Sequence, residues 1–244
     1  MAKLFRGFFG GRDDNGNDQP PAEPPPEAPF EYLTVRGEAV AAEMRRAESR
    51  AGVVPVLMGN RKAFEQAVEL IDLNPGDFDE IKKAGLELNV EQWIKDRVEE
   101  DPDVFEVEET QSATPDNPPP FYPARDVLTG KFEREVFIGL IPVETHWLVP
   151  AYLKLGGWNE CPDAHVHVAF FHRWHQRYGA RVITVTNDVI EFSVARPPST
   201  DAEAQELAWE QFVYCTDIVH QGVDTLGNLR ASLVNSPNWY FWWD

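Results

Sequence analysis

The stretch from residue 156 to residue 179 constrains the fold most, because its turn, helix and stop signals agree with one another. It opens with two glycines and Asn159, which favour a turn. Residues 164–178 then carry ring side chains at spacings of four, three and four, the pattern of one buried helical face. Gly179 supplies a C-terminal stop. The sequence therefore predicts a helix over 164–178 whose buried stripe is His167, Phe171, Trp174 and Tyr178.

The same stretch carries the side chains best suited to chemistry. Cys161 and His165 lie near the start of the predicted helix, where the helix dipole favours a thiolate and would lower the pKa of Cys161. His172 and His175 follow as neighbours on one side. Two hypotheses result, a nucleophilic Cys161 and a divalent metal site at His165, His172 and His175. Because the spacing matches no standard zinc module, ordinary burial is the simplest explanation, and we predict no cofactor.

Two segments after this helix, 181–186 and 189–196, alternate with period two and meet at Asn187-Asp188, which predicts a hairpin containing Glu191. A capping box at residues 200–203 then opens a helix with Cys215 on its buried stripe. Glu210 belongs to a carboxylate row on another side of that helix, a pattern typical of a solvated face. Glu191 and Glu210 are the further catalytic candidates beside Cys161 and His165.

The sequence ends in WYFWWD, and a segment this apolar must dock on something. As a strand it places Trp239, Phe241 and Trp243 on one face and Tyr240 and Trp242 on the other. We expect it to complete the core, and keep a stacking platform as the alternative. The candidate binding residues are Trp158, Asn159, Trp239 and Trp242.

In the N-terminal half, residues 37–72 predict a helix, an apolar strand and a second helix, with a glycine before and after the strand. This order of elements is typical of α/β folds. An apolar run within 132–143 predicts a strand covered on both faces. These signals predict an α/β (or α+β) fold with a mixed sheet of about four to six strands and helices on both faces. The predicted organisation is a disordered Pro-rich tail (1–29), an α/β element (30–110), a Pro-rich connector (111–130) and a C-terminal domain (131–244).

The formal charge of -19 excludes two partner classes. Such a field repels nucleic-acid phosphates and anionic lipid headgroups, and it attracts basic proteins. The two cysteines do not form a secreted disulfide framework, and no apolar run is as long as a membrane span. We therefore expect a cytoplasmic protein that binds neither nucleic acid nor membrane.

Several short motifs in the C-terminal part point to a family. They are Gly156-Gly157-Trp158-Asn159-x-Cys161-Pro162, Tyr178-Gly179-Ala180, Arg196-Pro197-Pro198 and the terminal WYFWWD. With these motifs the chain resembles the bacterial domain of unknown function 4253 over about residues 136–244. The resemblance implies no established activity, so no catalytic role follows from it.

Function must therefore be inferred from the residues themselves. The sequence has no P-loop, no dinucleotide-binding glycine pattern, no HExxH and no GxSxG. We favour a non-catalytic acidic module of the inhibitor or immunity type, which binds a basic protein through charge complementarity. The alternative is a hydrolase or metal-dependent enzyme with its site between Trp158 and His165, assisted by Glu191 or Glu210.

Overall fold

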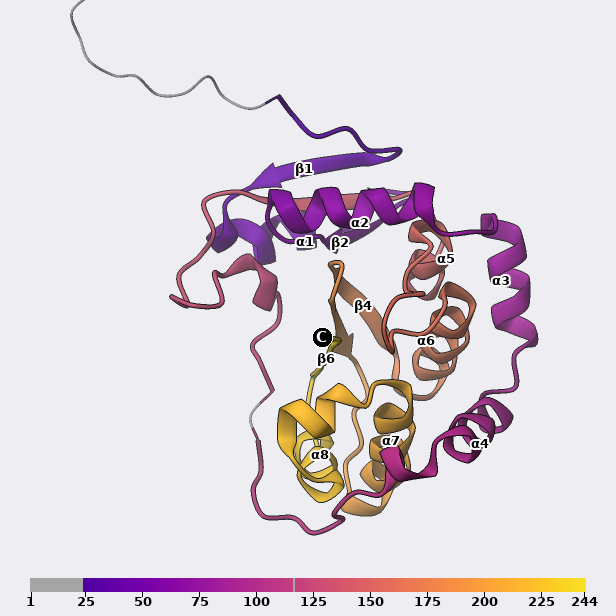
Figure 1. The fold of residues 1–244 in the computed structure, drawn as a ribbon. Coiled ribbons are helices and arrows are strands. Elements are labelled where there is room, and N and C mark those ends of the chain that lie inside the picture. Colours follow the sequence, from indigo (N-terminus) through magenta and orange to yellow (C-terminus); the bar gives the residue numbers. More distant parts are fainter. Residues whose placement is uncertain (1–23, 116) are drawn as a thin grey trace, which may run out of the picture.

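The computed structural model describes residues 24–115 and 117–244, and in them one six-stranded mixed sheet runs through the molecule (Figure 1). The strand order is β1-β3-β2-β4-β5-β6, and neighbours are antiparallel except for the parallel pair β2 and β4. The predicted mixed sheet is confirmed. The strands are β1 (Glu31–Val35), β2 (Val54–Leu57), β3 (Val136–Ile141), β4 (Ala180–Val185), β5 (Val189–Val194) and β6 (Asn238–Trp242).

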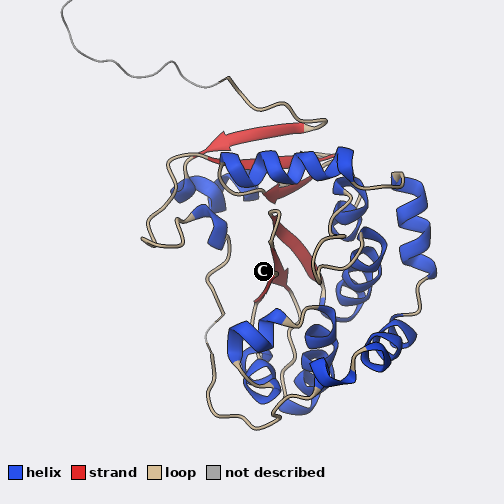
Figure 2. Ribbon diagram, in the orientation of Figure 1, coloured by secondary structure: helices blue, strands red, loops and turns tan. Residues whose placement is uncertain are grey.

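Helices cover both faces of the sheet, as predicted (Figure 2). Helix α1 packs on the face formed by β1, β3 and β2, and the larger core on the other face takes side chains from α2, α5, α6, α7 and α8. Helices α3 and α4 lie outside α6 and α7. The helices are α1 (Val40–Ala47), α2 (Arg61–Leu73), α3 (Phe78–Glu87), α4 (Val90–Glu100), α5 (Val149–Leu153), α6 (Ala164–Tyr178), α7 (Asp201–Tyr214) and α8 (Leu226–Leu233).

The two sides of the predicted connector 111–130 share one sheet. Strand β3, which follows the connector, lies between β1 and β2, which precede it. All of β3 is buried, because strands flank both its edges and side chains cover both its faces. Of the tail predicted over 1–29, residues 1–23 lie outside the described residues, and 24–29 form neither helix nor strand.

The main core is an aromatic cluster between α6, α7 and the last two strands. Trp174 of α6 stacks on Phe241 of β6, with ring centroids 5.3 Å apart and an interplanar angle of 7°. Phe192 of β5 and Tyr214 of α7 meet the same tryptophan edge-on. The predicted buried stripe of 164–178 is confirmed, since His167, Phe171, Trp174 and Tyr178 are all buried.

Helix α7 differs from the prediction at its C-terminal end and in its capping box. Helix α7 ends at Tyr214, Cys215 is its C-cap, and a short π-helix (Ile218–Val223) follows. The predicted capping box is half formed. Thr200 accepts from the backbone N–H of Glu203, but the Glu203 carboxylate accepts from the backbone N–H and hydroxyl of Ser199, which competes successfully for it.

Candidate functional sites

The loop before α6 folds back on itself and meets the C-terminal strand. Gly156 has φ of +87°, and a Cβ at this position would lie 1.7 Å from the carbonyl oxygen of Pro162, so only glycine fits. Asn159 has φ of +45° and donates from Nδ2 to the carbonyl oxygen of Asp244 at 2.7 Å. The two most specific motifs of the sequence therefore fold into one structural unit.

Cys161 lies in this unit beside a histidine. Its Sγ is 3.6 Å from Nε2 of His167, whose Nδ1 is 2.5 Å from the hydroxyl of Tyr214. Burial, with small contributions from nearby acidic groups, raises the pKa of the Cys161 thiol. Burial also lowers the pKa of His167 to about 3. The direction of this pKa shift is opposite to the one that a nucleophilic Cys161 would need, because loss of hydration outweighs the helix dipole, and Cys161 is buried as the simplest explanation had it.

The other histidines of α6 are dispersed. His165 borders a cavity near Lys154, His172 hydrogen-bonds Gln176 at 3.0 Å, and Nδ1–H of His175 donates to the carbonyl of Ala180 at 3.1 Å. Within residues 24–115 and 117–244, no three His, Cys, Asp or Glu side chains converge on a point that could hold a metal ion. His165, His172 and His175 therefore share one helix, but their side chains contact different groups.

Glu210 is buried in the face of α7 that packs against α6, so the expectation of a solvated side chain is wrong for this residue. Its carboxylate accepts from Nε1 of Trp174 at 2.5 Å and from Nε of Arg173 at 2.8 Å, with Arg177 at 3.4 Å. Burial raises the pKa of Glu210, and the two arginines and the indole partly oppose this shift. These contacts occupy both oxygens and describe a packing role.

Glu191 lies on the other face of the sheet. Its neighbour Phe192 packs against α6, so alternation along β5 turns Glu191 towards the short 3₁₀ segment η3 (Tyr122–Ala124). Its Oε1 accepts the backbone N–H of Tyr122 at 3.0 Å. Its Oε2, and Oγ1 of Thr184 close to it on β4, lack a hydrogen-bond partner of ordinary geometry in the described part of the chain.

Burial raises the pKa of Glu191 to about 7, although Thr184 and the backbone N–H groups of Tyr122 and Phe121 favour the charged form. A carboxyl group with such a pKa exchanges its proton near neutral pH. The sequence indicated Glu191 as a candidate, but it did not indicate that Tyr122, 69 positions away, is its hydrogen-bond partner.

The four tryptophan and asparagine candidates have different surroundings. Trp239 is buried in the core, Trp158 is half-buried, and Asn159 is exposed at its hydrogen bond to Asp244. Trp242 is half-buried and borders a cavity of about 460 Å³ on the face of Glu191. The predicted alternation of the C-terminal strand is confirmed, since Trp239, Phe241 and Trp243 are buried on the core side.

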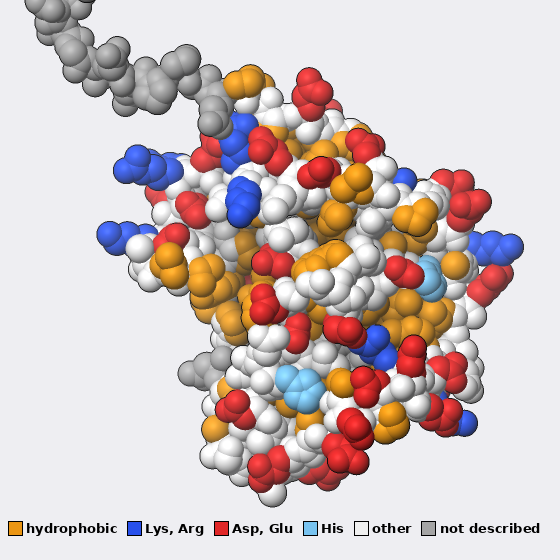
Figure 3. Space-filling model, in the orientation of Figure 1, with side chains coloured by type: hydrophobic (Ala, Val, Ile, Leu, Met, Phe, Trp, Pro, Cys, Tyr) orange, Lys and Arg blue, Asp and Glu red, His pale blue; other side chains and the backbone are white. Residues whose placement is uncertain are grey.

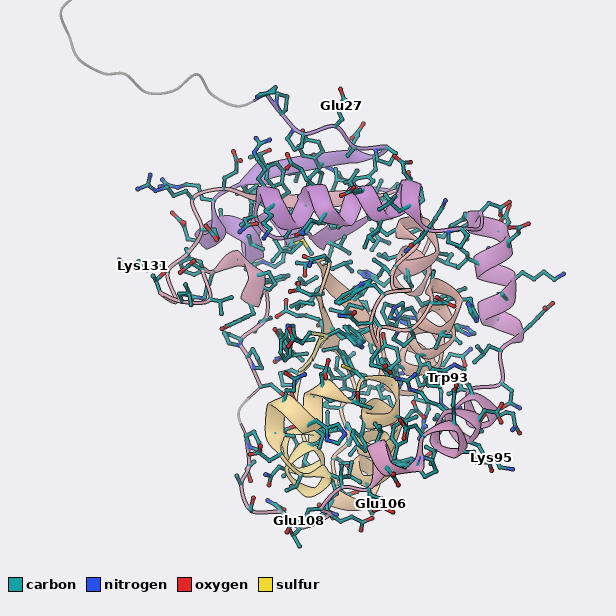
Figure 4. All side chains as sticks on the ribbon, in the orientation of Figure 1. Glu27, Trp93, Lys95, Glu106, Glu108 and Lys131 are labelled. Atoms are coloured by element: carbon teal, nitrogen blue, oxygen red, sulfur yellow. The ribbon has the colours of Figure 1, made fainter. Side chains whose placement is uncertain are left out.

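A further surface feature is the acidic segment, defined as residues 99–109. Its end beyond α4 crosses the lower part of the molecule, where Glu106 and Glu108 lie at the edge (Figure 4). Figure 3 shows acidic side chains gathered in the same region. The exposed carboxylates of the segment are Glu99, Glu100, Asp101, Asp103, Glu106, Glu108 and Glu109.

Comparison with known proteins gives one family match, in the C-terminal part of the chain. No helix of the described residues is long and apolar enough to cross a membrane. No curated protein and no solved structure matches the chain significantly. A family model does match, over the residues that contain the glycine loop, Cys161 and the whole of β6. The model describes a domain of unknown function (DUF4253) and matches residues 137–244, close to the range over which the sequence resembles that family.

Proposed function

We propose that this chain is a cytoplasmic, non-catalytic binding module that captures a basic protein on its acidic segment, as an inhibitor or immunity-type protein does. The observation that carries the proposal is that this row of exposed carboxylates is held in place by the body of the protein. Flexible acidic tails are common and unspecific, whereas a fixed row presents charges in one geometry.

Buried side chains anchor the segment at its centre. Phe105 inserts edge-on against Phe212 and Trp209, with ring centroids 5.6 and 6.4 Å away. The imidazole Nε2 of His220 donates to the carbonyl of Val104 at 2.8 Å. Phe105 is buried while Glu106 is exposed, so anchoring turns the acid outward.

Backbone contacts hold the end of the segment. The N–H of Leu226 donates to the carbonyl of Glu108 at 2.9 Å, and the hydroxyl of Thr225 donates to the carbonyl of Thr110 at 2.8 Å. A Cβ at Gly227 would lie 2.4 Å from the carbonyl oxygen of Glu109, so the close approach requires glycine.

Most carboxylates of the acidic segment form no ion pair with the described residues. Among the described residues, Glu99 is the one member of the segment in an ion pair, with Lys95 at 3.6 Å. A partner with clustered lysines or arginines would relieve the mutual repulsion of the remaining carboxylates. Binding of this kind is fast and weakens as salt is added.

Variants of equal charge test the proposal. We compare wild type, a segment variant (Asp103→Asn, Glu106→Gln, Glu108→Gln) and a matched variant with the same three changes of type at exposed positions elsewhere (Asp72→Asn, Glu69→Gln, Glu144→Gln). In pull-downs at low salt from native lysate, wild type and the matched variant should retain a stoichiometric basic protein that salt releases. The segment variant should not retain it. Equal retention by all three, or no retained protein, contradicts the proposal.

A second variant separates geometry from charge. Gly227→Ala keeps every carboxylate but displaces the backbone of residues 109–111, so it should weaken capture while circular dichroism shows the rest of the fold intact. Unchanged capture by folded Gly227→Ala would mean that the fixed geometry is irrelevant.

The alternative is an enzyme with its site between Trp158 and His165. The short distance between Sγ of Cys161 and Nε2 of His167 favours it. Nucleophilic catalysis requires a thiolate, however. Burial raises the pKa of Cys161 and lowers that of His167, so it favours the neutral thiol and the neutral imidazole. It therefore remains the second candidate.

A further inference from the structure

The face of the sheet opposite α6 holds an aromatic cavity that the acidic segment does not involve. Tyr122 of η3 and Tyr240 of β6 meet with ring centroids 5.9 Å apart and an interplanar angle of 88°, so they form two walls at a right angle. Trp242, two residues along the same strand face, adds a third aromatic group. The cavity volume of about 460 Å³ suits a small molecule.

The cavity is acidic. Of the described residues, Asp126, Glu133 and Asp188 line it, against one cation, Arg125. That cation already has partners, since Nη1 of Arg125 donates to the carbonyl of Gly130 at 3.0 Å and its guanidinium lies 3.7 Å from the ring centroid of Phe132. The lining therefore attracts a positively charged ligand.

Glu191 lies behind the aromatic walls, bonded to the backbone of Tyr122 and opposite Tyr240 in the strand register. It is 2% exposed, and its Oε2 has no hydrogen-bond partner among the described residues. Buried polar atoms without partners are rare, and each calls for an explanation. A cation bound in the cavity would explain this unpartnered oxygen, because it would stabilise a negative charge on the carboxyl group of Glu191.

We propose that this cavity binds a small organic ammonium ion, which packs against the rings of Tyr122, Tyr240 and Trp242 with Asp188 and Glu191 as its counter-charges. Aromatic faces attract cations through the ring quadrupole, and cages of several aromatic rings recognise quaternary ammonium groups. The carboxylates exclude anions from the same space. This site is independent of the acidic segment and of any protein partner.

The site also predicts a proton linkage. The pKa of Glu191 is about 7, so a large fraction of the group is protonated at pH 6. A bound cation favours the carboxylate, and binding at pH 6 therefore releases a proton to the buffer.

Isothermal titration calorimetry with choline, tetramethylammonium and n-butylammonium tests the proposal, with 3,3-dimethyl-1-butanol as the neutral analogue of choline. At least one cation should bind, and for choline the neutral analogue should be at least about tenfold weaker. Tyr240→Leu should weaken cation binding by about tenfold, whereas Tyr152→Leu, outside the cavity, should not. Asp188→Asn, at a half-buried position, serves if Tyr240→Leu does not fold, and it should also weaken binding.

Proton release is read by repeating the titration at pH 6 in two buffers of different ionisation enthalpy. Wild type should release up to one proton per bound cation, and Glu191→Gln should release none. The proposal is overturned if none of the three cations binds, if the neutral analogue binds as well as choline, or if folded cavity variants bind as wild type does. Proton release that persists in Glu191→Gln removes Glu191 from the site.

Discussion

Two buried glutamates show how differently one protein can accommodate the same side chain. Glu210 meets two arginines and an indole N–H, which together favour its charge. Glu191 meets the backbone N–H of Tyr122, while its second oxygen has no hydrogen bond of ordinary geometry in the described chain. Burial raises both pKa values, but no cation among the described residues opposes the shift at Glu191 as Arg173 and Arg177 do at Glu210. Charge on Glu191 is therefore costly to the folded state.

Glu191→Gln should alter how stability depends on pH. The folded pKa of Glu191, about 7, exceeds that of an unfolded glutamate, so the folded state binds more protons and loses stability as pH rises between these values. The variant lacks this loss. Its stability relative to wild type, measured by urea unfolding, should improve by about 2 kcal/mol from pH 5 to pH 8. A pH-independent difference contradicts the assignment, and Glu144→Gln at an exposed position is the control.

At this scale the sequence predicts which residues carry chemistry, but it does not predict their partners. Activation of Cys161 was one hypothesis, because local spacing shows a helix start but shows neither the burial of the thiol nor His167 beside it, whose ring contacts Trp243 and Tyr214. Glu210 looked solvated because its row on α7 is acidic, and Arg173 and Trp174, which explain its burial, belong to another helix.

Among the elements, strand β6 contributes both to the core and to the cavity. Its inner side chains meet Trp174 of α6 and Tyr214 of α7, and its outer side chains line the acidic cavity. One strand of five residues thus serves the core on one face and the candidate ligand site on the other. The alternation was predictable from the sequence, whereas the pairing with β5 in register was not, because register depends on distant contacts.

Two alanine substitutions on β6 should differ strongly. Phe241→Ala removes a fully buried ring stacked on Trp174 and should destabilise the fold by about 3–5 kcal/mol. Trp242→Ala, next in sequence but half-buried on the opposite face, should cost about 1 kcal/mol. Urea unfolding of both variants measures the difference. Equal losses would mean that the strand does not have the proposed sidedness.

For the whole molecule, the family match and the folding unit do not coincide. The matched residues begin within β3, yet both strands that flank β3 come from before the connector. Residues 111–130 were predicted to be a domain boundary, because prolines and acidic residues interrupt the periodic hydrophobic segments there. The pairing of β1 and β2 with β3 leaves no such trace, because it joins segments far apart in the chain.

A fragment of residues 131–244 should therefore fail to fold alone. It would leave both edges of the fully buried β3, and one edge of β4, without their partners. We expect aggregation or a circular dichroism spectrum without cooperative thermal loss, whereas residues 24–244 should unfold in a single transition. A soluble fragment that melts cooperatively would show that the C-terminal part is an independent unit.

The strand order also has a consequence for how the chain reaches its native state. Strand β3 can be inserted only after the long intervening segment has brought it between β1 and β2, and the parallel contact of Leu57 with Thr184 closes a longer loop still. Loop-closure entropy must be overcome before these contacts contribute, so the sheet centre assembles late and slowly. Until then the apolar side chains of β3 are accessible to other chains. Assembly of this sheet is thus the step most exposed to competition from aggregation.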